Sequence, residues 1–128
     1  MEKDIKNNEI IIYEGEEGQP RIEVTFQGET VWLTQAQLVN LFQSSKANIS
    51  EHIKHIFEEQ ELNRDSVVRK FRTTAIDGKN YEIEHYNLDL IISLGYRVKS
   101  QIATKFRIWA TACLTAKKSD EKSEIKTL

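Results

Sequence analysis

The sequence has only one cysteine, one proline and five glycines among its 128 residues. Cys113 has no second cysteine for an internal disulfide, which excludes a disulfide-stabilised scaffold and favours a reducing compartment. The glycines are scattered, so no glycine-rich loop of the kind that holds nucleotide phosphates is present. No apolar run approaches the roughly 18 residues of a membrane span, and no secretory signal is visible. We therefore expect a cytoplasmic protein that does not enter a membrane.

An excess of charge of one sign is also missing, because 18 basic and 20 acidic residues leave a net charge of −2. This balance does not favour nucleic-acid binding, but the charges are distributed unevenly along the chain. Residues 1–31 carry eight acids and three bases, whereas residues 90–118 carry six bases and no acid. The basic C-terminal part could therefore face an anion.

The composition that remains is that of an ordinary globular protein, with 39% apolar and 30% charged residues. This length and composition suit one domain with one hydrophobic core. We expect a flexible N-terminus over residues 1–8, a domain over residues 9–116, and a loose charged tail over residues 117–128. The tail is predicted because charges alternate there without a strong apolar stripe.

Short strands are expected in the N-terminal part. Glu9–Tyr13 is an apolar run, and Arg21–Phe26 alternates apolar and polar residues, which is typical of a half-buried strand. Glu14–Pro20 contains two glycines and the proline, so it is expected to be a loop. A third strand is expected at Thr30–Leu33.

A helix-turn-helix is predicted across residues 34–57. Thr34 and Gln37 have the spacing of a capping box at the start of the first helix. Gln43–Ser45 interrupts the helical pattern, and Ser44 or Ser45 can cap the second helix. The apolar stripes of the two helices consist of Leu38, Leu41 and Phe42, and of Ile49, Ile53, Ile56 and Phe57.

A hairpin is predicted next, after a polar connection over Glu58–Asp65, with strands at Val67–Ala75 and Lys79–Tyr86. A two-residue loop would place Phe71 opposite Glu84, which mixes core and solvent residues. A three-residue loop with a left-handed Gly78 makes every opposing pair compatible. In this register the expected pairs are Phe71–Ile83, Thr73–Tyr81, Lys70–Glu84 and Arg72–Glu82.

Two helices are expected after the hairpin. Asn87 can cap the first, with Leu88, Ile91 and Ile92 directed inward, and Gly95 either ends it or allows close packing. Ser100 can cap the second, in which Ile102, Phe106, Trp109 and Cys113 recur at helical spacing. Because Cys113 lies on this stripe, a packing thiol is favoured over a reactive one.

The predicted helix-turn-helix suggests DNA binding, because such a motif places its second helix in the major groove. Asparagine can bind adenine through two hydrogen bonds, lysine can reach guanine or phosphate, and amides at helix starts can hold phosphates. The hairpin suggests a wing, although Lys70 and Arg72 each face a glutamate. The basic stretch over residues 96–107 could clamp a phosphate backbone. The candidate DNA-binding residues are Thr34, Gln35, Lys46, Asn48, Ser50, Lys54, Lys79, Arg97, Lys99, Lys105 and Arg107.

Four segments, Val31–Gln35, Ile49–Glu59, Tyr86–Val98 and Phe106–Thr111, resemble the N-terminal region of the RhuM family of virulence-associated bacterial proteins. The resemblance covers roughly residues 9–115. That region is in turn similar to phage antirepressor and Bro-N-type DNA-binding domains. The resemblance implies a DNA-binding regulatory role and an origin in a mobile element or pathogenicity island. Family members are usually longer, with a further C-terminal half.

The sequence gives little support to the hypothesis that the chain is an enzyme. His52 and His55 lie three residues apart on a helix, but no recognised spacing supplies a third metal ligand. We expect no catalytic residues, cofactor, metal or small-molecule substrate. The competing hypothesis is a protein-interaction module, in which the helix-turn-helix is a scaffold and the acidic N-terminal sheet or an edge strand binds a partner, such as another copy of the chain.

The sequence therefore predicts an α+β domain that binds double-stranded DNA, with a homodimer as a further expectation. A winged helix-turn-helix-like core would follow a small N-terminal antiparallel sheet. Two C-terminal helices would pack Ile91, Ile92, Phe106 and Trp109 onto that core.

Overall fold

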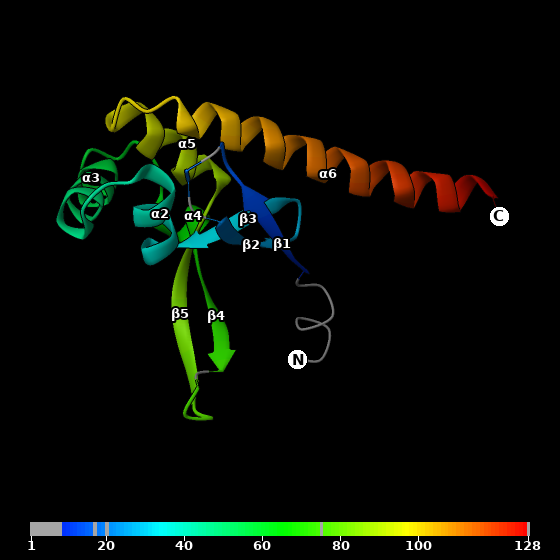
Figure 1. The fold of residues 1–128 in the computed structure, drawn as a ribbon, viewed down its shortest axis with the longest axis horizontal. Coiled ribbons are helices and arrows are strands. Elements are labelled where there is room, and N and C mark those ends of the chain that lie inside the picture. Colours follow the sequence, from blue (N-terminus) through cyan, green and yellow to red (C-terminus); the bar gives the residue numbers. More distant parts are fainter. Residues whose placement is uncertain (1–8, 17, 20, 75, 128) are drawn as a thin grey trace.

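The computed structural model describes residues 9–16, 18–19, 21–74 and 76–127, with side chains described except at positions 73–74 and 118–127. The predicted flexible N-terminus over residues 1–8 lies outside the described residues. The α+β class is confirmed (Figure 1). In chain order the described elements are β1 (Glu9–Glu14), β2 (Arg21–Gln27), β3 (Thr30–Thr34), α2 (Gln35–Phe42), α3 (Lys46–Glu58), α4 (Arg64–Val67), β4 (Val68–Thr74), β5 (Asn80–Asn87), α5 (Leu88–Arg97) and α6 (Ile102–Thr127).

The strands form one antiparallel sheet in the order β1-β2-β3-β5-β4. The N-terminal strands were expected to form a separate small sheet, but β3 pairs with β5, so the hairpin continues the same sheet. The pairing places Leu33 beside Tyr86 on one face and Trp32 beside Asn87 on the other. Separate sheets would leave both edges without partners, whereas this pairing satisfies them.

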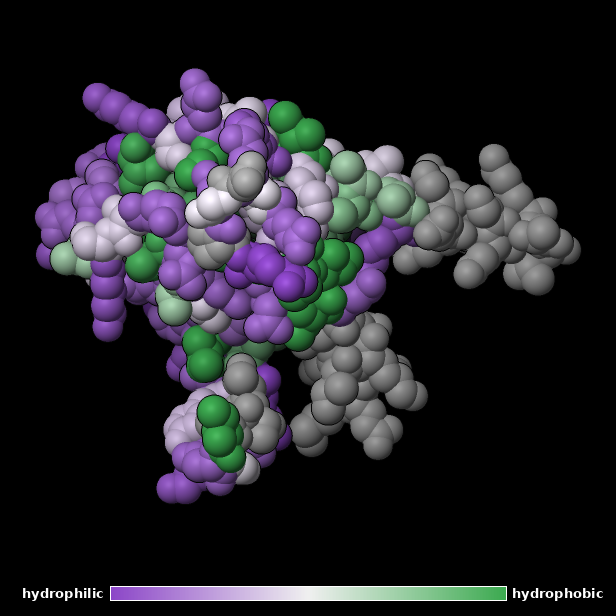
Figure 2. All heavy atoms as spheres, viewed as in Figure 1, coloured by the Kyte–Doolittle hydropathy of each residue, from purple (hydrophilic) through white to green (hydrophobic). Residues whose placement is uncertain are grey.

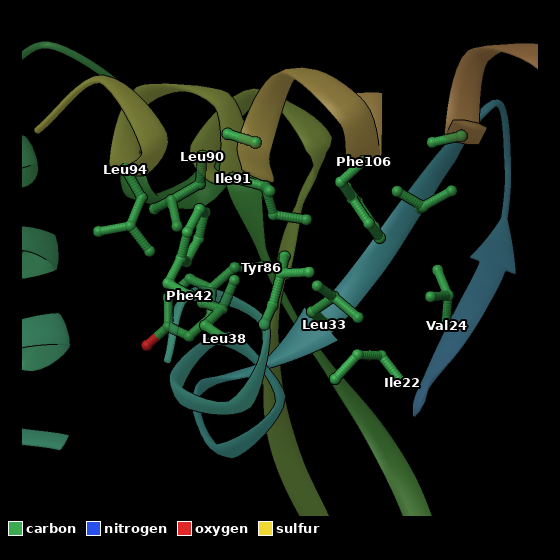
Figure 3. Close-up of a cluster of buried hydrophobic side chains, with 14 of the residues drawn as sticks. Ile22, Val24, Leu33, Leu38, Phe42, Tyr86, Leu90, Ile91, Leu94 and Phe106 are labelled. Carbon is green, nitrogen blue, oxygen red and sulfur yellow. The ribbon is translucent and has the colours of Figure 1, made fainter. Parts of the chain in front are cut away.

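The hydrophobic core lies between the sheet and the helices α2, α5 and α6. Figure 3 shows Leu33 and Tyr86 from the sheet among side chains from the three helices. Those helical side chains include Leu38 from α2, Leu90 from α5 and Phe106 from α6, and none of the three is exposed to solvent. Alternate residues of β2 face this core, because Ile22, Val24 and Phe26 are all buried in it. This confirms the buried face that was predicted for the strand.

The two predicted helices of the helix-turn-helix are present with their caps. The Thr34 hydroxyl accepts from the Gln37 amide at 3.1 Å, and the Gln37 side chain accepts from the Thr34 amide at 2.8 Å. Ser45 caps α3 and accepts from the Asn48 amide at 3.0 Å. Gln43 ends α2 in the left-handed conformation, with φ of 52°. The turn is therefore made by a residue type that normally avoids this conformation.

The polar connection between α3 and the hairpin contains a short helix that was not predicted. The Asn63 side chain caps α4 by accepting from the Asp65 amide at 2.9 Å. Val67 at its end is buried in the core. Four residues are too few to show helical periodicity, which is why the pattern was missed.

The hairpin has the predicted register, with Phe71 opposite Ile83 and Lys70 opposite Glu84. Gly78 has φ of +83°, as the three-residue loop requires. Phe71 packs edge-on against Trp32 and His85, on the sheet face opposite the helices. Part of the predicted core face is therefore a small aromatic cluster outside the main core.

Helices α5 and α6 meet at Gly95, which settles the alternatives left open for this residue. Helix α5 continues to Arg97, and a Cβ at position 95 would lie 2.1 Å from the Ala103 Cβ. Gly95 therefore allows close packing rather than ending the helix. The inward residues of α5 are Leu90, Ile91 and Leu94, so the prediction for Ile92, which is only half-buried, was wrong.

Helix α6 runs from Ile102 to Thr127, so the predicted loose tail over residues 117–128 is helical as far as Thr127. The stretch lacks an apolar stripe, but it contains no glycine or proline and is rich in lysine and glutamate, which are good helix formers. No helix among the described residues is long and apolar enough to cross a membrane.

Candidate nucleic-acid interface

A groove lies between the first turns of α2 and α3 and the hairpin, and has a volume of about 740 Å³. Thr34, Gln35 and Lys46 of the predicted DNA-binding set line it. The lining residues that were not predicted are Ala36, Val39 and Asn40 from α2 and Glu82, Ile83, Glu84 and Tyr86 from β5. Sequence reasoning missed the β5 residues because β5 meets α2 only through the long-range pairing of β3 with β5.

The exposed side of α3 carries the remaining predicted residues of the helix-turn-helix. Ile49, Ile53 and Ile56 are buried, which leaves Lys46, Asn48, Ser50 and Lys54 exposed. The Asn48 side chain donates to the Ser44 hydroxyl at 2.7 Å, so its amide nitrogen also stabilises the helix start. Lys54 lies 4.0 Å from Glu58, a separation at which an exposed pair stabilises little.

Acidic residues reduce the positive charge of this surface. Glu51 is exposed on α3, and its carboxylate lies 3.6 Å from His55. Glu84 in the groove is held by Arg64 at 2.5 Å, and Glu82 lies opposite Arg72 in the hairpin register. Lys46 forms no ion pair with any residue of the described part of the chain.

The hairpin extends beyond the body of the molecule (Figure 1). Lys79 lies at its tip, and its backbone amide donates to Asp77 at 2.9 Å. Its side chain is exposed. Among the basic residues that the structure describes, Lys79 therefore lies closest to the tip of the hairpin.

Two of the four bases in the predicted basic stretch over residues 97–107 are paired with carboxylates. Arg97 donates to Glu59 at 2.8 Å and to Glu61 at 2.7 Å, and Lys105 bonds to Glu16. The hydrogen bonds from Arg97 lower the pKa of both glutamates. Arg97 therefore ties the end of α3 to the end of α5. Its Nε is a buried atom for which the described residues supply no partner.

Lys99 and Arg107 line a separate cavity of about 240 Å³ at the junction of α5 and α6. This junction and the hairpin tip lie at opposite ends of the view in Figure 1. The structure thus divides the predicted residues between two surfaces. Thr34, Gln35, Lys46, Asn48, Ser50 and Lys54 lie at the end of β3 and on α2 and α3, whereas Lys99 and Arg107 lie on the far side from the hairpin.

Histidine and cysteine are the residues of the described chain that bear on metal or nucleophilic chemistry. The side chains that the structure describes contain no group of three or more His, Cys, Asp or Glu residues arranged to hold a metal ion. His85 is buried on the outer face of the sheet, where its ring contacts Phe71 at 4.8 Å between centroids and its Nδ1 lies 2.9 Å from the Ile83 carbonyl oxygen. Burial lowers the His85 pKa. Burial also raises the pKa of the Cys113 thiol, which disfavours a reactive thiolate.

Residues 66–118 match the model of a family described as "Virulence protein RhuM family". The match supports the resemblance seen in the sequence and spans β4, β5, α5 and the first part of α6. It covers less than half of the chain and does not include the helix-turn-helix. Comparison with curated proteins and with solved structures finds no match.

Proposed function

We propose that the chain is a non-enzymatic regulatory domain that binds double-stranded DNA in the cytoplasm. The observation that carries this proposal is the groove shared by the first turns of α2 and α3 and by the hairpin. Helix-turn-helix proteins use the first turns of the second helix for base contacts, and the first helix lies against the phosphate backbone. Here both helix starts and the projecting hairpin border the same concave surface.

The described residues suggest a division of roles on this surface. Lys46, Asn48 and Ser50 are exposed on α3 and are the proposed base contacts. The backbone amide at Gln35 and the Lys79 side chain at the hairpin tip are the proposed phosphate contacts. Arg97 and Lys105 are left out of the proposed interface because carboxylates hold their charges.

The resemblance also supports a biological setting. Because residues 66–118 match a family described by virulence, we propose that the regulated genes belong to a virulence-associated or mobile element. The match does not include α3, so the DNA-binding role rests on the geometry of the groove and on the similarity of the RhuM region to phage DNA-binding domains.

The number of available cations sets the expected salt dependence of binding. On random duplex DNA, where no base-specific contact forms, Lys46 can contact phosphate as Lys54 and Lys79 do; if each neutralises one phosphate, affinity falls about 40-fold between 50 and 200 mM salt. Fluorescence anisotropy with a labelled duplex measures this fall. The absence of binding at the lowest salt concentration would contradict the proposal.

A pair of variants with equal charge loss locates the interface. We expect Lys46→Ala with Lys54→Ala to weaken DNA binding, and Lys99→Ala with Arg107→Ala to leave it unchanged. Both variants remove two positive charges, so a non-specific loss of charge affects them equally. Equal weakening would show that the groove is not the contact surface. Lys46→Ala with Asn48→Ala should in addition relax any sequence preference in a selection from random duplexes.

A further inference from the structure

The two edges of the sheet differ in a way that points to a partner. Strand β4 carries Arg69, Lys70 and Arg72, and bases on an edge strand discourage pairing with another chain. Strand β1 at the other edge carries the consecutive isoleucines Ile10, Ile11 and Ile12 and no base. Among the described residues no strand pairs with the outer side of β1. The outward backbone donors and acceptors of β1 therefore have no strand partner within the described part of the chain.

Strand β1 exposes apolar side chains on the sheet face opposite the helices. Ile10 is 61% exposed and Ile12 is 40% exposed, whereas Tyr13 on the other face is buried. Figure 2 shows hydrophobic side chains gathered over β1, below α6. An edge strand with this composition is the kind that adds a strand from another molecule.

The acids that flank β1 do not oppose such pairing. The Glu14 carboxylate lies 3.0 Å from Arg21, and Glu9 is bonded to Lys117. Each carboxylate thus has a base of its own chain beside it, which reduces repulsion between two like-charged strands.

Helix α6 exposes a second apolar surface on the same side of the molecule. Lys105 bonds to Glu16 near the end of β1, and Ala112 and Ala116 follow Lys105 by seven and eleven residues, which places them on the same side of the helix. Both alanines are exposed, and the adjoining Ile108 is 57% exposed. Small residues allow another helix to approach closely.

We propose that this side of the molecule pairs with a second copy of the chain, through an antiparallel β1–β1 ladder about a two-fold axis at Ile11. In this register Ile11 faces Ile11 of the second copy, and Ile10 faces Ile12 of the second copy on the outer sheet face. No two carboxylates face each other. The two sheets then continue as one across the axis, which removes the unprotected edge of both copies.

The position of α6 fits this arrangement. The Trp109 ring lies 5.0 Å from the Tyr13 ring on β1 and 5.8 Å from the Phe26 ring on β2, so α6 lies over the gap between these strands. The α6 helix of each copy would then lie beside the two-fold axis on the same face of the continuous sheet, so the two helices would be neighbours across the axis. Ala112 from each copy would face this contact.

The surface is formed by both β1 and α6, which favours a partner that contacts both of these elements. A short peptide strand would contact only β1, whereas a second copy contributes its own β1 and α6. A second copy is therefore the occupant that buries the most of this surface. The inference is independent of DNA binding.

The mass of the chain in solution tests the proposal. Light scattering over a concentration series should give twice the chain mass of 14.9 kDa for the unmodified chain. Ile10→Lys with Ile12→Lys should reduce the mass to that of one chain, and Ala112→Glu on α6 should do the same. Ile76→Lys is the matched control, because Ile76 is fully exposed at the hairpin tip, and it should stay dimeric. A monomeric unmodified chain, or a dimer that both edge substitutions leave intact, would overturn the proposal.

Disulfide cross-linking tests the register. In a chain with Cys113→Ser, Ile11→Cys should cross-link under mild oxidation because facing Cα atoms of an antiparallel pair lie about 4.5–5.5 Å apart, within the range that a disulfide spans. Ile10→Cys is the control, since the two copies of residue 10 would be about 8 Å apart, too far for a disulfide. Equal cross-linking of both variants, or none at position 11, would rule out this register.

Discussion

The contact between α5 and α6 at Gly95 allows a quantitative test of the fold. A Cβ at position 95 would lie 2.1 Å from the Ala103 Cβ, whereas carbon atoms pack at about 3.5–4.0 Å. Gly95→Ala therefore forces the helices more than 1 Å apart, at a cost near the upper end of the about 1–3 kcal/mol of overpacking. The better helix propensity of alanine offsets about 1 kcal/mol. We expect a net loss of about 2 kcal/mol, or a Tm lower by about 8 °C.

A double-mutant cycle isolates the contact. Ala103→Gly alone should cost about 2 kcal/mol, from lower helix propensity and the loss of a buried methyl group. In the double variant the methyl group introduced at position 95 occupies the space that the Ala103 methyl vacates, and the two propensity changes cancel. The double variant should therefore lie within about 1 kcal/mol of the unmodified chain, a coupling of about 3 kcal/mol.

Urea denaturation followed by circular dichroism measures the four free energies of unfolding. If the two losses simply add, the double variant is about 4 kcal/mol less stable, and the steric argument is refuted. A neutral Gly95→Ala variant would refute it equally, because α5 and α6 would then have room for the methyl group.

Other features of the fold make further predictions. Gln43→Gly should raise the Tm in a thermal melt by about 2 °C, because glycine removes the cost of the left-handed conformation at the end of α2; a lower Tm would contradict this. Burial lowers the pKa of His85 from 6.5, so the unfolded chain takes up its proton first and stability falls as the pH drops below 6.5. His85→Phe should flatten that part of a urea-midpoint profile, and an unchanged slope would show that His85 is not its source. The hydrogen bonds from Arg97 lower the pKa values of Glu59 and Glu61 from 4.5, so the stabilisation is complete above pH 4.5 and is lost as the pH falls through the lowered values. Arg97→Met should weaken this acid dependence, and a profile parallel to that of the unmodified chain would assign it to other carboxylates.

Local features were predictable because neighbouring residues determine them. The capping box at Thr34 and Gln37 marked the start of α2 to the residue. Compatibility of opposing side chains was enough to choose the hairpin register, since a shift by one residue would have placed Phe71 opposite Glu84. Both inferences use interactions within one element or across one turn.

The pairing of β3 with β5 could not be predicted in the same way. Periodicity shows which face of a strand is buried, but it does not show which strand lies beside it. Leu33 and Tyr86 are 53 residues apart and meet only when the whole sheet forms. The groove depends on this pairing, because β5 provides one of its walls. The side of the groove formed by α2 and α3 was therefore visible in the sequence, and the side formed by β5 was not.

The uneven distribution of charge along the chain has a different meaning from the one that the sequence suggested. The acidic N-terminal part and the basic C-terminal part were expected to form a polarised surface with a free basic end. Instead Lys105 bonds to Glu16 and Lys117 bonds to Glu9, so α6 lies along β1 with charges of opposite sign in contact. An acidic segment and a basic segment in one sequence can therefore indicate that the two segments pack together. The basic residues that form ion pairs in that contact are not available to bind phosphates. This is why a DNA interface is better sought at Lys46 and the hairpin than in the most basic stretch of the sequence.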